Sequence, residues 1–530
     1  MNSKYIKIAI AALAINFSFI SCERDLNEFN SSDVTSETIY QDFNNYKGVL
    51  AKCYAGLSLS GQGGGDDRAD VGGIDGGMSN YLRQYFQLQE LPTDEAVIGW
   101  GDANLPDLHN MNWGADNQFT TAMYYRIMYQ VTLTNEFIRE TSDEKLSSRG
   151  ISGTQAEEAR LFRNEARFLR ALSYYHAIDL FGNVPFVDEN SPVGVTPPPR
   201  IERKDLFSYV EKELKDLESK LKAPRTNEYG RADQAAVWML LSKLYLNAEV
   251  YTGQAHYNEA ADYAKKVINS GFSLKPKYEE LFLADNDINN NEVIFSINYD
   301  GAQSRTWGGT TYIIHAGIGG KMDPSKYGVN GGWWGLRTTK NLVQKFPDAN
   351  GSKDIRGRFF TNGQNDEINN IGDFADGYPL IKFKNVTKAG VAGKDSSGNF
   401  VDTDFPMFRL ADAYLMYAEA VLRGANGSTA EALSYVNQLR ERAYGNTSGN
   451  INLSQLTLDF ILDERARELA WEASRRTDLI RFGKFTSAAY LWAWKGGVKE
   501  GKAVDGFRTL YPIPSKDLIA NPNLKQNQGY

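Results

Sequence analysis

The sequence predicts a mainly α protein in which helix pairs stack like tetratricopeptide repeats and an irregular, loop-rich half carries short strands. Apolar residues recur every three or four positions in several long segments. Residues 410–443 form a helix–loop–helix unit of 34 residues, the length of a tetratricopeptide pair. Residues 299–400 are instead rich in Gly, Asn and Asp, with weak helix signals. A generic helical bundle is the alternative to stacked pairs.

The helices can be placed in chain order from this periodicity. Phe162, Ala166 and Leu169 share one face of a helix. Pro185 and the run 197–199 break the pattern and predict a rigid linker. Helices are predicted over 38–58, 118–140, 155–181, 202–222, 231–249, 256–270, 406–423, 428–443 and 454–475, with a strand at 291–298.

Charge and composition exclude several classes of protein. The chain has 530 residues and a net charge of −8, which argues against a nucleic-acid-binding protein that relies on a basic face. With 4 His and 2 Cys, a disulfide scaffold, a multi-Cys zinc site and a multi-His metalloenzyme are excluded. Aromatic residues reach 12%, which a binding surface and a helical core could both explain.

The first 21 residues predict a lipoprotein signal peptide. Lys4 and Lys7 precede a short apolar stretch that is too short for a comfortable transmembrane helix. The stretch ends in Ser21-Cys22 and resembles a bacterial lipobox, so Cys22 is the expected lipidation site. Cys53 lies in an apolar helical stretch and is expected in the core.

No catalytic motif is apparent. HExxH, GxSxG and CxxC are missing from the sequence, and the four histidines have no ligand spacing. Residues 463–468 alternate in charge along a helix, which indicates internal ion pairs rather than acid–base catalysis. Catalytic residues are therefore not expected.

One segment has the oxygen-rich spacing of a calcium loop. Asp285 and Asp287 are separated by Asn286, but the glycine expected at the sixth position is replaced by Asn290. The segment predicts either a structural calcium ion held by the two aspartates or an Asx-rich turn. No other cofactor is expected.

Tryptophans gather in glycine-rich loops. Residues 60–77 contain eight glycines and are followed by Trp100, while Trp307, Trp333 and Trp334 lie in the irregular half. Glycine allows tight turns and close approach of rings, and an indole face can stack on the apolar face of a pyranose. Local packing of the loops is the alternative for any single ring. For the set, a glycan-binding platform is favoured.

Longer motifs resemble a known family. The segments are 162–175 (FRNEARFLRALSYY), 179–185 (DLFGNVP), 464–469 (ERAREL), 475–483 (RRTDLIRFG) and 511–514 (YPIP). Together they resemble the SusD/RagB family of surface glycan-binding lipoproteins of Bacteroidetes. The resemblance covers the whole mature chain.

The resemblance implies a tetratricopeptide-like scaffold with a less regular glycan-facing half, and no catalysis. It implies a surface-exposed outer-membrane lipoprotein that acts as a lid over a SusC-like TonB-dependent porin. It also implies a single fold over 22–530, with an N-terminal region of about 22–225, a C-terminal region of about 226–530 and the loop-rich insert 299–400.

Further segments resemble the starch-binding founder of that family: 91–95 (LPTDE), 251–254 (YTGQ), 285–287 (DND) and 490–497 (YLWAWKGG). This closer resemblance implies a starch-like α-glucan as the ligand. The founder's bound calcium also supports a calcium ion at Asp285 and Asp287.

The founder's binding residues can be carried over by local context. Its three stacking aromatics fall on Trp100, Trp307 and Trp333, with Trp334 as the alternative to Trp333. Its hydrogen-bonding arginine falls on Arg83. A polar partner after the first aromatic falls on Asp102 or Asn104, because Ala103 occupies the simplest alignment.

Two other functions remain open at this point. The ligand could be another glycan, or a peptide as in some relatives. A secreted glycoside hydrolase would need two carboxylates flanking one bond, and no such pair can be identified from the sequence.

Overall fold

A computed structural model describes residues 36–65, 68–194 and 196–530. The chain divides into two units, one ending at Tyr46 and the other spanning Lys47–Tyr530. The predicted signal peptide over 1–21 and the lipidation site Cys22 lie outside the described residues.

The described part of the first unit holds α2 (Ser36–Ile39) and the start of α3 (Asn44–Ser58). The single helix predicted over 38–58 is wrong, because a turn separates the two helices. The Asp42 carboxylate accepts a hydrogen bond from the backbone N–H of Asn44 at 3.0 Å and so marks the beginning of α3.

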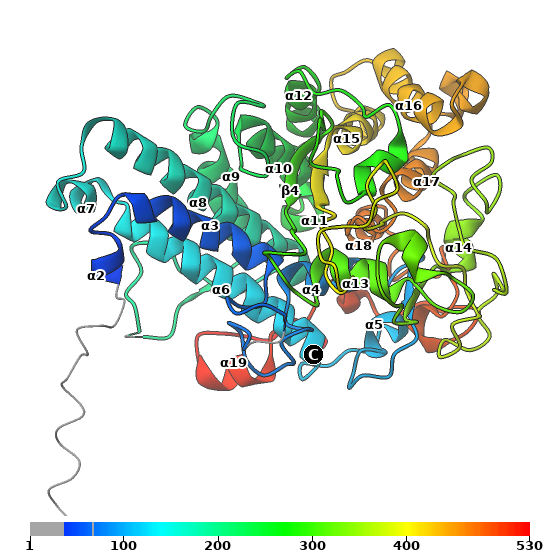
Figure 1. Ribbon diagram of the computed structural model, residues 1–530, viewed down its shortest axis with the longest axis horizontal. Helices are drawn as coiled ribbons and strands as arrows, with labels where there is room; N and C mark the ends of the chain where they lie inside the picture. Colours follow the sequence, from blue (N-terminus) through cyan, green and yellow to red (C-terminus); the bar gives the residue numbers. More distant parts are fainter. Residues whose placement is uncertain (1–35, 66–67, 195) are drawn as a thin grey trace, which may run out of the picture. The chain divides into compact units, whose positions relative to one another are not determined.

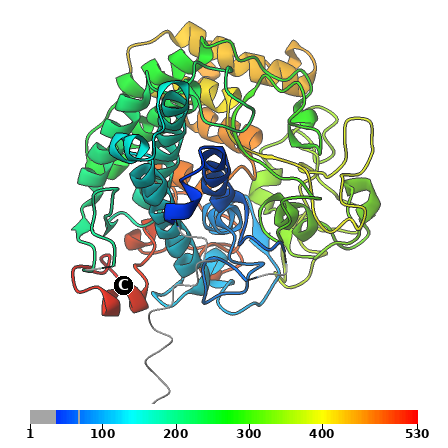
Figure 2. The same ribbon diagram turned by 60° about the vertical axis from the view of Figure 1, so that its left-hand side comes forward.

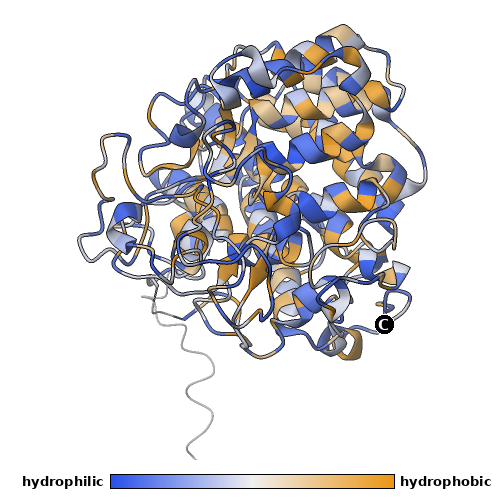
Figure 3. Ribbon diagram, turned by 90° about the vertical axis from the view of Figure 1, so that its right-hand side faces the viewer, coloured by the Kyte–Doolittle hydropathy of each residue, from blue (hydrophilic) through white to orange (hydrophobic). Residues whose placement is uncertain are grey.

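In the larger unit, long helices pack side by side in chain order, and each contacts the next (Figure 1). Figure 3 shows hydrophobic residues alternating with hydrophilic ones along the helices, as the period of 3.6 requires. The predicted scaffold of stacked helices is confirmed. In order, the helices are α6 (Gln118–Glu140), α8 (Gly153–Leu180), α9 (Arg203–Leu217), α10 (Gln234–Leu246), α12 (Tyr257–Ile268), α15 (Leu410–Leu422) and α16 (Thr429–Tyr444).

A strand delays the start of α15. The predicted strand at 291–298 is confirmed as β4 (Val293–Ile297), and it pairs antiparallel with β6 (Phe405–Arg409). The helix predicted from 406 therefore begins only at Leu410, because the preceding residues bond to β4.

The helix predicted over 454–475 is also interrupted. It is split into α17 (Leu458–Leu469) and α18 (Arg475–Arg481). Between them, Trp471 and Ala473 adopt left-handed backbone conformations with φ of 61° and 57°, which an α-helix cannot continue through.

One central helix was not predicted. In α4 (Tyr81–Glu90) every residue is buried, including the polar side chains of Gln84, Gln87 and Glu90. Leu82, Tyr85 and Phe86 nevertheless recur at helical spacing, so the segment carries a periodic signal that the prediction missed.

The loop-rich half over 299–400 lies on the opposite side of the unit from α8 (Figure 2). Its regular elements include α13 (Gly309–Ala316), which was not predicted, and β5 (Leu336–Arg337). The strand β5 pairs antiparallel with β1 (Val97–Ile98), so this half is attached to the segment that follows α4.

The remaining elements are short. At Pro185, where a break in the helical pattern was predicted, the chain forms a short strand. This strand pairs with a second one after the proline-rich loop and so joins the two ends of that loop. The short elements are α5 (Asp107–Asn110), α7 (Asp143–Ser148), α11 (Ala248–Thr252), α14 (Lys340–Val343), α19 (Ser515–Ala520), β2 (Val184–Pro185), β3 (Arg200–Ile201), and the 3₁₀ turns η1 (Tyr278–Phe282), η2 (Pro324–Tyr327), η3 (Thr447–Gly449), η4 (Leu453–Gln455), η5 (Lys495–Gly497) and η6 (Gly506–Thr509).

A buried ion-pair network connects the helical layer to the loop-rich half. Glu468 of α17 accepts from Arg356 at 3.0 Å and from Arg409 at 2.6 Å, and it also pairs with Arg442. Glu464 pairs with Arg356 at 2.7 Å. The predicted internal ion pairs of the charged helix are confirmed. The network comprises Glu292, Asp354, Arg356, Lys382, Arg409, Arg440, Arg442, Glu464, Arg467, Glu468 and Glu472.

Candidate functional site

Three partly exposed indole rings from distant segments meet at one place, which we call the tryptophan arc: Trp100, Trp307 and Trp333. The ring centroids of Trp100 and Trp333 are 6.3 Å apart, and those of Trp307 and Trp333 are 6.0 Å apart. The ring planes in these two pairs are tilted by 45° and 53°. Neighbouring faces are therefore not coplanar, so the three rings do not form one flat surface.

Strand pairing brings together the two segments that carry Trp100 and Trp333. Beyond the β1–β5 pair, the N–H of Gly99 donates to the carbonyl of Gly335 at 3.0 Å. The indole N–H of Trp100 then donates to the carbonyl of Trp333 at 2.9 Å. This bond fixes the edge of the Trp100 ring.

The other two rings rest on buried or partly buried partners. Trp333 stacks on His315 of α13, with centroids 4.7 Å apart and planes only 16° apart. Trp307 lies just before α13 and packs on Phe400, with centroids 4.6 Å apart. Rings held from behind in this way are pre-organised for a ligand, because little side-chain entropy is lost on binding.

Glycine is required where backbone approaches the arc. A Cβ atom on Gly335 would lie 2.5 Å from the Trp100 ring. A Cβ atom on Gly77 would lie 3.1 Å from Trp307, and Gly77 belongs to the glycine-rich segment at 60–77. The predicted role of glycine, close approach of rings and backbone, is thus confirmed at these positions.

Arg83 lies behind the arc. It belongs to α4 and is only 4% exposed, with its guanidinium carbon 4.4 Å from the centroid of Tyr312 and 5.8 Å from that of Trp100. One terminal nitrogen donates to the carbonyl of Gly77 at 2.9 Å, while Nε has no hydrogen-bond partner in the described part of the chain. Burial lowers the pKa of Arg83, against the opposing influence of Tyr312 and the Asp102 carboxylate.

The two candidates for the polar partner differ in their surroundings. Asp102 is exposed, and its charge acts on Arg83. The side-chain oxygen of Asn104 accepts from the N–H of Gln118 at 3.0 Å, and its nitrogen lies 3.5 Å from the carbonyl of Asp116. Asn104 therefore holds the loop before α6, while Asp102 is available to solvent.

Trp334 lies outside the arc. Its ring packs against Phe374, with centroids 5.8 Å apart, and the side chain is exposed. Of the two consecutive tryptophans, Trp333 is the one beside Trp100 and Trp307. Sequence reasoning missed Phe400 and His315 as supports, since neither carries a motif or a regular spacing to the arc.

The predicted calcium ligands do not form a recognisable metal cluster. The Asp285 carboxylate accepts from the N–H of Lys388 at 3.0 Å, and Asp287 is exposed. Over the described ranges, no three His, Cys, Asp or Glu side chains gather closely enough to hold a metal ion. Calcium at this segment stays a prediction.

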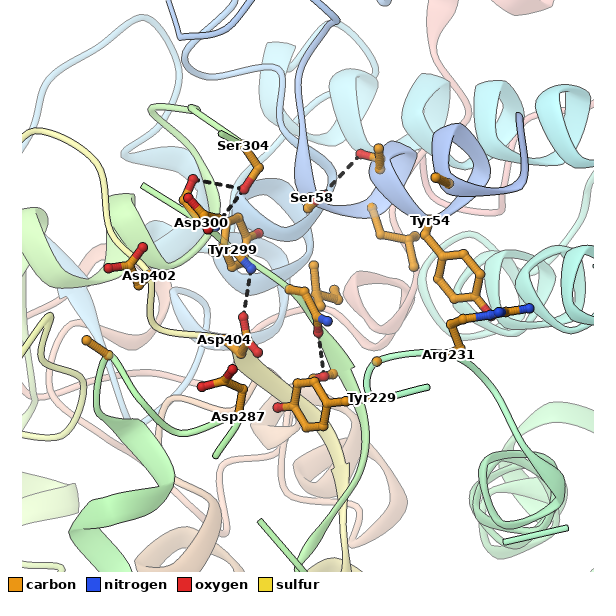
Figure 4. Close-up of a pocket in the computed structure, with 18 of the residues that line it drawn as sticks. Tyr54, Ser58, Tyr229, Arg231, Asp287, Tyr299, Asp300, Ser304, Asp402 and Asp404 are labelled. Carbon is orange, nitrogen blue, oxygen red and sulfur yellow. Dashed lines mark hydrogen bonds between the residues drawn. The ribbon is translucent and has the colours of Figure 1, made fainter. Parts of the chain in front are cut away.

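A separate cavity of about 810 Å³ lies beside β4 (Figure 4). Tyr54, Tyr229, Asp287 and Asp404 line it, and the tryptophan arc does not. Burial, together with the Asp287 and Asp402 carboxylates, raises the pKa of Asp404 to about 8. The cavity has mixed apolar and acidic walls, and it lacks the row of stacking faces that distinguishes the arc.

Fold and site together define a binding protein: a helical scaffold supports an aromatic surface formed by loops. Residues 354–530 match the sequence profile of the SusD family. The chain is 35% identical to the starch-binding protein SusD of Bacteroides thetaiotaomicron over 100% of both chains. The chain belongs to the SusD family, whose members are glycan-binding proteins rather than enzymes.

Solved structures support the fold assignment. A SusD superfamily protein from Bacteroides thetaiotaomicron superposes with a TM-score of 0.69 at 22% identity, covering 92% of this chain and 99% of that one. Surface glycan-binding protein A from Bacteroides thetaiotaomicron, in complex with laminarihexaose, gives 0.68 at 21% identity and covers 91% and 99%. SusD-like protein P2 of Formosa agariphila is 27% identical over 80% of this chain and 83% of its own.

Among the described residues, no helix is both long and apolar enough to cross a membrane.

Proposed function

We propose that this protein binds starch-like α-glucan at the cell surface, without catalysis, and delivers it to a SusC-like TonB-dependent porin in the outer membrane. The observation that carries the proposal is the convergence of Trp100, Trp307 and Trp333 in one aromatic surface. The similarity to the starch-binding protein SusD over the full chain supports starch as the ligand. Arg83 and Asp102 supply polar groups next to the rings.

The net charge of −8 agrees with a neutral ligand. A neutral glucan gains apolar contact and hydrogen bonds and needs no positively charged surface. An anionic glycan would instead be repelled by the acidic chain at low salt.

A polysaccharide panel tests the choice of ligand. The protein is run through native gels that contain amylopectin, laminarin, xylan or pectin, with bovine serum albumin as a non-binding control. Retardation by amylopectin is the expected result. Retardation by laminarin and not by amylopectin would show that the ligand is another glucan rather than starch. Free migration in every gel would contradict the proposed function.

Replacing Gly335 by alanine is expected to disturb the arc. The new Cβ would lie 2.5 Å from the Trp100 ring, so the ring must move. Overpacking of this kind costs about 1–3 kcal/mol, and we expect weaker maltoheptaose binding by calorimetry. Gly331→Ala in the same loop is the matched control, since nothing lies within 4 Å of its Cβ. Equal affinities for the two variants would show that the position of Trp100 is unimportant.

The lipid anchor is tested at Cys22. In cells, Cys22→Ser is expected to leave the protein unprocessed or released from the outer-membrane fraction, because the thiol that takes the lipid is lost. Cys53→Ala is the control: Cys53 is fully buried, and burial raises the pKa of its thiol to about 12, so it is unreactive. Unchanged fractionation of Cys22→Ser would refute the anchor.

A further inference from the structure

Trp334 combines two unfavourable features. Its side chain is 55% exposed, although indole is among the largest apolar groups. Its backbone is left-handed, with φ of 56°, a region that residues with a Cβ rarely occupy. A glycine at this position would avoid both costs.

Two other tryptophans in left-handed conformations show how such a cost is normally offset. Trp471 has φ of 61°, is 1% exposed, and donates its indole N–H to the carbonyl of Glu95 at 3.2 Å. Trp494 has φ of 69° and donates to the carbonyl of Ile368 at 2.9 Å. Over the described part of the chain, the indole N–H of Trp334 has no such partner, and its ring is not buried.

The backbone holds Trp334 in this orientation. The N–H groups of Trp333, Trp334 and Gly335 donate in turn to the carbonyls of His315, Ile318 and Ala316, at 2.7, 3.0 and 2.9 Å. Two neighbouring rings therefore leave the turn in fixed directions. Strain that the surrounding hydrogen bonds maintain points to a functional role for the side chain.

Trp334 directly follows the arc residue Trp333 in the chain, and its ring has a support of its own. It packs on Phe374, and the loop before Phe374 lies against Gly99, whose Cβ would be 2.9 Å from the carbonyl oxygen of Ile371. Arg337 of β5 ties the same loop down by donating to the carbonyl of Asp373 at 2.9 Å. Next to the arc in the chain, Trp334 thus offers a supported and exposed aromatic face to a glucan that extends beyond the arc.

We propose that Trp334 is a second stacking surface, outside the arc, for the extension of a neutral glucan chain that is longer than the arc itself can cover. The inference rests on the proposed function, since it needs a glucan in the arc. It adds a determinant of chain length: short oligosaccharides occupy the arc alone, and longer ones also contact Trp334.

The variant Trp334→Gly tests this by isothermal titration calorimetry with maltotriose and maltoheptaose. Glycine accepts the left-handed backbone, so the variant is expected to fold at least as stably as the parent. We expect maltotriose affinity within about twofold of the parent and a loss of at least about 5-fold for maltoheptaose, the lower end of the worth of one stacked ring. Trp334→Phe keeps an aromatic face and should restore most of the maltoheptaose affinity.

Each outcome bears on a different part of the inference. Unchanged maltoheptaose affinity in Trp334→Gly overturns the second stacking surface but leaves the proposed function intact. Equal losses for both sugars would place Trp334 in the main site and also overturn it. If the parent protein binds neither sugar, the proposed function fails, and the inference fails with it.

Discussion

Trp100→Ala and Trp333→Ala are each expected to lower the affinity for maltooligosaccharides sharply while the protein stays folded. Each variant removes one stacking face, and by analogy with bases stacked on aromatic side chains this costs about 1–3 kcal/mol. Trp100→Ala also removes the hydrogen bond from the Trp100 indole N–H to the carbonyl of Trp333. We therefore expect Trp100→Ala to lose more affinity than Trp333→Ala. Calorimetry with maltoheptaose measures both effects.

Trp238→Ala is the matched control for these variants. Trp238 is partly exposed on α10 and donates its indole N–H to Glu218 at 3.1 Å, away from the arc. Its replacement should leave the affinity unchanged. Far-ultraviolet circular dichroism should show the same helical content in all three variants. Parent-like affinity in both Trp100→Ala and Trp333→Ala would eliminate the arc as the binding site.

Glu468→Gln is expected to destabilise the fold by about 3–5 kcal/mol, the usual cost of breaking a buried ion pair from one side. Glu468 is fully buried and faces three arginines, Arg356, Arg409 and Arg442. The glutamine has nearly the same shape but leaves excess positive charge in the core. Urea unfolding followed by circular dichroism measures the change in unfolding free energy.

Asp459→Asn on the same helix is the control. Asp459 pairs with Lys484 at 2.6 Å but is largely exposed, so the change should cost less than about 1 kcal/mol. If Glu468→Gln also lowers the unfolding free energy by less than about 1 kcal/mol, the buried ion-pair network is not important for stability.

The same network gives the stability a pH dependence. Burial alone would raise the pKa of Glu464, but Arg356, Arg467 and Arg440 outweigh it and lower the pKa to about 2. The pKa of Glu468 is lowered too, because Arg442, Arg409 and Arg356 outweigh its burial. Carboxylates with a depressed pKa stabilise the fold above the unfolded pKa of about 4.3. Stability should therefore fall as the pH decreases from about 4 toward 2, and less steeply in Glu468→Gln.

Periodicity predicted most of the long helices but missed α4. The helix α6 was predicted with the bounds that the structure has, because one face is apolar and the other polar. The buried helix α4 also places Leu82, Tyr85 and Phe86 on one face, and it was missed although this signal is present. The true start of α15 depends on the pairing of β6 with β4, which is more than a hundred residues away in the chain and leaves no local signal.

The candidate site was predictable only in part. Tryptophans in glycine-rich loops indicated a platform, and the family resemblance selected Trp100, Trp307 and Trp333. The resemblance could not distinguish Asp102 from Asn104. In the structure the side chain of Asn104 bonds the loop before α6 while Asp102 is exposed, so Asp102 is the residue that we propose as the polar partner. Phe400 supports Trp307 from a distant loop, and nothing in the sequence connects the two.

The arc is assembled from three separate segments of the chain. Ligand binding therefore requires the fold that brings these segments together. No fragment that lacks one of these segments can present the complete aromatic surface. A glucan that needs all three rings binds the native chain and not the unfolded one. It must then raise the unfolding free energy by RT ln(1 + [L]/Kd), and the melting temperature becomes a function of sugar concentration.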